Sequence, residues 1–180
     1  MKDNASRFIS IFIATIMLLT ITSSTIYGVD KSYEISSAPP QISKELKGKE
    51  ELIKYFSEIK RIRNNMNTIS INSETAKQKS DTIQKQITSY SSELKTILNL
   101  IARFKVVYKD SSSDLFVANQ IEIVAFILDS SLQQQALLVD RLVQGEATDL
   151  FFSEYLVSIY YYLNIADEMI SYLERFYGIR

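Results

Sequence analysis

Apolar residues recur along most of this chain at intervals that alternate between three and four positions. This spacing places successive side chains on one side of an α-helix, whereas a half-buried strand would alternate at every second position. The pattern therefore predicts helices that pack along a continuous apolar stripe. From residue 52 onward the stripe comprises Leu52, Tyr55, Ile59, Ile62, Met66, Ile69, Ser73, Ala76, Ser80, Ile83, Ile87, Tyr90, Leu94, Ile97, Ile101, Phe104 and Tyr108.

Two later stretches repeat the same spacing. The first is interrupted by Gln135 and consists of Ala118, Ile121, Ala125, Leu128, Leu132, Val139 and Leu142. The second is unbroken and consists of Phe152, Leu156, Ile159, Leu163, Ala166, Ile170, Leu173 and Tyr177. Between the stretches, KDSSSD at 109–114 offers oxygens to cap a helix, Gly145 can end one and Thr148 can begin the next. We therefore expect an all-α domain over residues 43–180.

The segment NNMNTISINSETA at 64–76 decides the architecture, because the apolar stripe continues through it without glycine or proline. A helix from about 44 to 108 would be roughly 95 Å long, and a C-terminal helical hairpin could cover only about half of it. However, Asn64 and Asn65 can leave a helix with positive φ, and Asn72 can cap a new helix with Glu74 in its first turn and Ile71 placed to pack on Ala76. We favour the break, which gives helices near 43–64, 72–108, 113–143 and 148–178 in an antiparallel up-down four-helix bundle.

The first 28 residues differ from the rest of the chain. Lys2 and Arg7 precede an apolar run from Phe8 to Ile21, and small polar residues follow. This layout is typical of a secretory signal that is cleaved after Ser24 or Gly28, although residues 8–28 could also remain as a membrane anchor. Residues 29–42 contain Pro39 and Pro40 and are expected to form a flexible linker. We expect the helical domain to be exported, whether periplasmic, cell-surface or secreted, and predict no membrane span after residue 28.

Charge divides the helical domain into two halves. Residues 43–109 contain 14 lysines and arginines against 7 acidic residues, and residues 110–180 contain 3 against 11. In an up-down bundle the basic first and second helices would each lie beside an acidic helix, so the asymmetry can order the packing. A basic surface could also make weak contact with an anionic membrane surface. Nucleic acid is not expected as a partner, because the chain is nearly neutral overall and has no nucleic-acid-binding motif.

Most catalytic chemistry is excluded by composition, since the chain contains neither histidine nor cysteine. Catalytic triads, common zinc sites and di-iron sites need at least one of these residues. The four glycines are too dispersed for a phosphate-binding loop. We therefore expect no enzyme activity, no cofactor and no metal.

The last predicted helix contains an unusual number of aromatic residues. Beside its apolar stripe runs a second stripe displaced by one residue, and Tyr161 lies on the side away from the first stripe. Amphipathic aromatic rings supply much contact area at small entropic cost, so a protein partner that docks here is the first hypothesis. A small apolar ligand or lipid in an aromatic-lined core is the alternative, and a homo-oligomer follows if the long helix forms. The candidate surface consists of Phe151, Tyr155, Tyr161, Tyr162, Met169 and Phe176.

Overall fold

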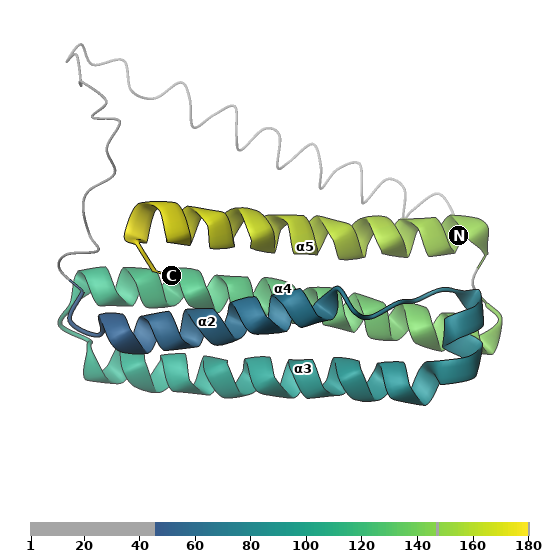
Figure 1. Ribbon diagram of the computed structural model, residues 1–180, viewed down its shortest axis with the longest axis horizontal. Helices are drawn as coiled ribbons and strands as arrows, with labels where there is room; N and C mark the ends of the chain where they lie inside the picture. Colours follow the sequence, from purple (N-terminus) through teal and green to yellow (C-terminus); the bar gives the residue numbers. More distant parts are fainter. Residues whose placement is uncertain (1–45, 147, 180) are drawn as a thin grey trace, which may run out of the picture. The chain divides into compact units, whose positions relative to one another are not determined.

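The described part of the protein is an antiparallel four-helix bundle. The computed structural model describes residues 46–146 and 148–179, so the predicted signal or anchor (1–28), the linker (29–42) and residues 43–45 lie outside it. The helices are α2 (Lys49–Met66), α3 (Ser73–Val107), α4 (Ser112–Gln144) and α5 (Asp149–Tyr177). Each runs opposite to the one before it, with α3 and α5 on opposite sides of α4 (Figure 1). The predicted all-α bundle is confirmed.

The chain breaks between α2 and α3, so the long-helix alternative does not form. Asn72 caps α3, because its side-chain oxygen accepts the amides of Glu74 at 3.0 Å and Thr75 at 2.8 Å. The Thr75 hydroxyl in turn accepts the Asn72 amide at 2.9 Å, which completes a reciprocal capping box. The prediction that the chain leaves α2 at Asn64 and Asn65 with positive φ was wrong. Helix α2 continues to Met66, and only glycines have positive φ among the described residues.

Two features make the reversal compact. Residues 67–72 are not helical, and α3 is kinked at Lys79, whose φ of −133° and ψ of 20° interrupt the helix. Figure 1 shows the first turns of α3 set across the end of the bundle, before the helix turns to run along α4. No proline or glycine marks this kink in the sequence, and the regular apolar spacing gave no sign of it.

The start of α2 lies six residues later than the predicted position 43, because residues 47 and 48 are held against the other helices. The fully buried carboxylate of Asp114, in the first turn of α4, accepts the amides of Lys47 at 3.1 Å and Gly48 at 2.9 Å. The rings of Phe104 and Tyr108 lie directly over Gly48. Hydrogen bonds to a buried carboxylate are among the stronger ones in proteins, so they fix the chain at this end of the bundle.

Helix α4 supplies the largest share of the core. Its buried apolar residues face the other three helices and are Val117, Ala118, Ile121, Val124, Ala125, Leu128, Leu132, Leu138, Val139 and Leu142. Within the described ranges it is the one helix long and apolar enough to cross a membrane by length and composition, a property that the sequence analysis did not assign to it. Burial against three helices accounts for only part of this apolarity, because Phe116, Ile123, Phe126, Leu137 and Val143 stay exposed.

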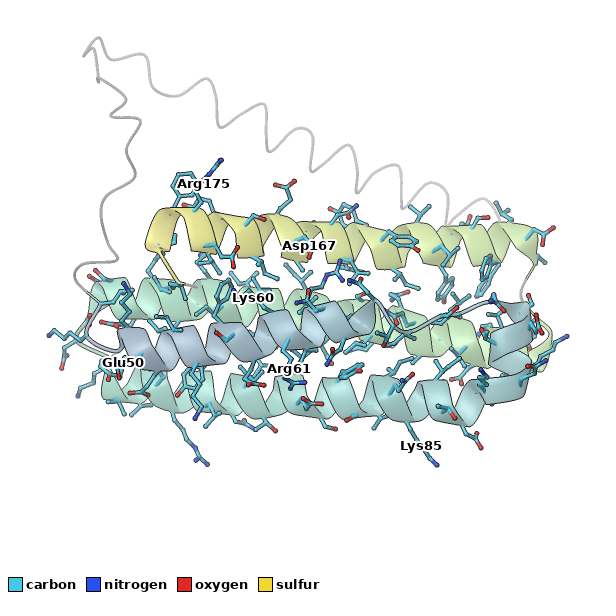
Figure 2. The ribbon with its side chains drawn as sticks, in the orientation of Figure 1. Glu50, Lys60, Arg61, Lys85, Asp167 and Arg175 are labelled. Carbon is cyan, nitrogen blue, oxygen red and sulfur yellow. The ribbon has the colours of Figure 1, made fainter. Side chains whose placement is uncertain are left out.

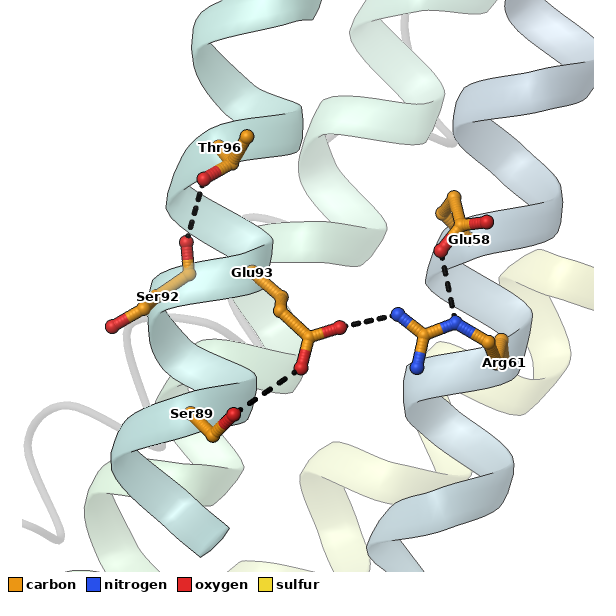
Figure 3. A network of polar contacts seen from close by, with 6 residues as sticks. All are labelled: Glu58, Arg61, Ser89, Ser92, Glu93 and Thr96. Atoms are coloured by element: carbon orange, nitrogen blue, oxygen red, sulfur yellow. Dashed lines mark hydrogen bonds and ion pairs between the residues drawn. The ribbon is translucent and has the colours of Figure 1, made fainter. Parts of the chain in front are cut away.

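Ion pairs join helices of opposite charge, as the charge asymmetry predicts. Lys60 of α2 contacts Glu174 of α5 at 2.6 Å, and the Arg63 guanidinium donates two hydrogen bonds to Asp167 at 2.6 and 2.8 Å. Lys105 of α3 contacts Glu122 of α4 at 2.7 Å. Arg61 of α2 donates to Glu58 of its own helix and to Glu93 of α3, which joins the two basic helices (Figure 3). Because most of these side chains are partly exposed, they order the helices more than they stabilise them.

Replacing Gly48 with alanine should destabilise the bundle by about 1–3 kcal/mol, the usual cost of overpacking. A Cβ atom there would lie 2.3 Å from Cε2 of Phe104, which is itself buried and cannot move aside freely. Urea unfolding of Gly48→Ala measures the loss, and Ser57→Ala, at an exposed position of α2, is the control expected to change stability little. Equal stability of Gly48→Ala and the wild type would show that the rings do not pack on this backbone.

Candidate partner-docking face

Five of the six residues in the candidate surface lie together on one side of α5. Phe151, Tyr155, Tyr162, Met169 and Phe176 are all half-buried and lie along one side of the helix. The opposite side faces α2, as the contacts of Asp167 and Glu174 with that helix show. Tyr161 does not belong to this group, because its ring is 61% exposed and points outward, although it lies 5.9 Å from the ring of Tyr162.

Helix α4 extends this surface with a stripe that the sequence analysis missed. Phe116, Ile123 and Leu137 recur at multiples of seven positions and remain partly exposed, so they lie in one row along the outer side of α4. The ring of Phe116 packs 5.8 Å from that of Tyr177 of α5, which places this row beside the α5 aromatics. The spacing was visible in the sequence, but only the packing of α4 on α5 joins the two rows.

We call the combined surface the uncharged face. It consists of Phe116, Gln120, Ile123, Ile127, Ser130, Gln134 and Leu137 of α4 with Phe151, Tyr155, Ser158, Tyr162, Ile165, Met169, Tyr172 and Phe176 of α5. None of these described residues is charged, and most are apolar or aromatic. A mainly apolar surface of this length is uncommon on a monomer and is a candidate interaction site.

Charged residues begin at the edges of the uncharged face. On α5 the neighbouring row contains Glu154, Tyr161, Glu168 and Arg175, and Figure 2 shows Arg175 pointing away from the bundle. On α4 the neighbouring row contains Phe126, which is 54% exposed, and Asp140, which accepts a hydrogen bond from Gln84 at 2.8 Å. At the end of α4, Arg141 follows Gln134 by seven positions and pairs with Glu146. The edges therefore carry three acidic and two basic residues, while the surface between them has no formal charge.

Aromatic rings are most dense at the end of the face near the C-terminus of α5. Tyr172 packs 4.8 Å from Phe176, and its hydroxyl lies 3.2 Å from that of Tyr177. Burial raises the pKa of Tyr177 to about 12, and the hydrogen bond with Tyr172 adds to the shift. The Tyr177 phenol thus anchors this end of the face to the core beneath it.

A separate pocket lies where α2 ends. Residues 67–71 run past α4 and α5 without helical structure, and beside them is a half-open pocket of about 300 Å³. Its walls combine aliphatic side chains, including Met66, Ile69 and Leu163, with polar groups such as those of Asn67 and Ser70. Gln135 also lines it, with its amide nitrogen 3.4 Å from the Ser131 hydroxyl. None of the six residues of the candidate surface lines this pocket.

Other kinds of site find no support in the described residues. Within 46–146 and 148–179 no cluster of three carboxylates could hold a metal ion. Comparison of this chain with protein-family models, with curated proteins and with solved structures finds no match. Function must therefore be argued from the geometry of the bundle.

The free energy of unfolding should fall between pH 10 and 12 because of Tyr177. Below pH 10, the ordinary pKa of tyrosine, the phenol is neutral in both the folded and the unfolded chain. Its contribution to the free energy of unfolding is then fully present. Above pH 10 the unfolded chain loses this proton while the folded chain keeps it until about pH 12. Urea unfolding at pH 9, 10 and 11 should therefore show a shallower decline in Tyr177→Phe than in the wild type. An equal fall in the free energy of unfolding in both proteins would contradict the raised pKa of Tyr177.

Proposed function

We propose that this protein is an exported, non-enzymatic binding protein that docks another protein on its uncharged face. The observation that carries the proposal is a long surface of mainly apolar and aromatic residues, drawn from two helices, that is left partly exposed and has no charged residue along its rows from Phe116 to Leu137 of α4 and from Phe151 to Phe176 of α5. Protein interfaces are depleted of charge at their centre and enriched in tyrosine, phenylalanine and methionine, which is the composition of this surface.

The size of the uncharged face also suits a protein partner. From Phe151 to Phe176 the α5 row runs about 38 Å at 1.5 Å per residue, and two neighbouring helices are about 20 Å wide. The footprint of the two helices, edge rows included, is therefore close to the roughly 800 Å² per partner of a standard interface. A small molecule would need only a fraction of this surface, so its extent favours a macromolecule.

Export remains a prediction from residues 1–28, and the linker at 29–42 would let an anchored domain reach its partner. The absence of histidine and cysteine supports a binding role over catalysis. A weak contact of the basic helices with anionic membrane is a lesser expectation, since Lys60, Arg61 and Arg63 are already engaged in ion pairs within the bundle.

Photo-crosslinking in the producing cells tests this proposal. The photoreactive residue p-benzoylphenylalanine at Phe126, beside the uncharged face, should give a discrete protein adduct on illumination. The same residue at Thr96, an exposed position on the outer side of α3, is the matched control and should give none. Equal adducts from both positions, or none from Phe126, would contradict docking at this face. The mass of the purified chain also tests export, because cleavage after Ser24 or Gly28 removes a defined segment.

The pocket beside residues 67–71 supports a second candidate function, the binding of a small neutral amphiphile. Its volume of about 300 Å³ lies at the lower end for small-molecule sites. Gln135 is 4% exposed and, among the described residues, its carbonyl oxygen accepts no hydrogen bond. A ligand with an apolar body and one N–H or O–H group could use this acceptor.

Indole is a suitable probe of the pocket, since its N–H can donate to Gln135 while its rings contact the aliphatic walls. In an NMR titration we expect shifts of the amides of Ile69, Ile71 and Gln135. Gln135→Leu should weaken binding about three-fold to ten-fold, corresponding to one hydrogen bond. Gln133→Leu, at an exposed position on the same helix, should leave it unchanged. Shifts that spread over the bundle, or none at millimolar indole, would remove this candidate.

A further inference from the structure

The charges around the uncharged face indicate what kind of protein would dock there. We infer that the partner is an amphipathic helix whose apolar stripe is flanked by lysine or arginine and which lies lengthwise on α4 and α5. This inference rests on the proposed function and names the chemistry of its partner.

The shape of the face favours a helix. Its two rows follow the seven-residue repeats of α4 and α5, with Phe116, Ile123 and Leu137 on one side and Tyr155, Tyr162, Met169 and Phe176 on the other. Side chains with this repeat meet a third helix that crosses at a small angle, as they do in helical bundles. A partner helix of about 25 residues would match the length of about 38 Å. A helix that lays an apolar side on such a surface is a recurrent mode of recognition.

The edges of the face determine the charge of that helix. Glu154 and Glu168 stand on the α5 edge, two seven-residue repeats apart or about 21 Å, and neither forms an ion pair with any described residue. Asp140 stands on the α4 edge, with Asp129 one row behind it. Two basic residues also border the face, Arg175 on α5 and Arg141 on α4, and Arg141 is already paired with Glu146. Lysine or arginine beside the partner's apolar stripe would lie opposite these carboxylates, which favours correct register and fast association.

The same charges disfavour a second copy of this chain as the occupant. Two uncharged faces packed together would bring the acidic edges of both copies into proximity, and like charges across an interface cost binding energy. The basic side of a second copy does not fit either, because the outer side of α3 presents Ser89, Ser92, Thr96 and Asn99 with no apolar stripe. A separate basic helix satisfies both the apolar centre and the acidic edges.

Binding of designed helical peptides to the full chain tests the charge of the partner. Two labelled peptides of about 28 residues carry the same leucine and isoleucine stripe, one flanked by lysine and the other by glutamate. Fluorescence anisotropy should show the lysine peptide binding at least about ten-fold more tightly, with the difference reduced at high salt. Ile123→Lys should abolish binding, Thr96→Lys should not, and Glu154→Lys with Glu168→Lys should reduce or reverse the preference.

The alternatives give different results. If the glutamate peptide binds as well as the lysine peptide, the charge inference fails, while adducts from Phe126 would still support docking at the face. If neither peptide binds and light scattering shows a dimer that Ile123→Lys dissociates, the occupant is a second copy and the inference is wrong. If neither binds and the chain is monomeric, the basic-helix partner is also ruled out. Circular dichroism of each variant confirms that the bundle is intact.

Discussion

The burial of α4 is the constraint on which this bundle depends. Apolar residues occupy most of the circumference of this helix, so a single neighbour cannot cover it, and α2, α3 and α5 each contribute one wall. The loops on both sides of α4 are short, which forces α3 and α5 to lie antiparallel to it. The third wall must come from α2, which is possible only because the chain reverses between Met66 and Ser73. The helix break is thus a requirement of core formation and not a local irregularity.

Two groups of hydrogen bonds hold α2 in this place. At one end the buried carboxylate of Asp114 ties the amides of Lys47 and Gly48 to the first turn of α4. At the other end the capping box of Asn72 and Thr75 starts α3 after the reversal. Because α2 is only 18 residues long and α4 is 33, the non-helical segment after Met66 must cover part of α4. An extended chain is thinner than a helix, which explains why a pocket remains beside it.

Charge is distributed in a way that fits this packing. The boundaries between α3 and α4 and between α5 and α2 join basic to acidic helices and contain ion pairs. Helices α4 and α5 are both acidic, and charged residues along their common boundary would repel. That boundary is uncharged instead, so the two helices pack without an electrostatic cost. The same feature leaves a long apolar surface with acidic edges, which is the basis of the proposed docking of a basic helix.

The sequence by itself determined the helical class, the four segments and the turn at Asn72, since apolar spacing and capping residues act over a few neighbouring positions. It also identified Tyr155, Tyr162 and Met169 of α5 as neighbours, because they share one side of a single helix. Only the tertiary structure decided that Phe116, Ile123 and Leu137 of α4 continue this surface, that Tyr161 stands apart from it, and that Gly48 lies under Phe104. These relations join residues far apart in the chain, and they depend on how the helices rotate about their own axes when they pack. Local sequence patterns do not specify that rotation. It is set by the burial of the whole core.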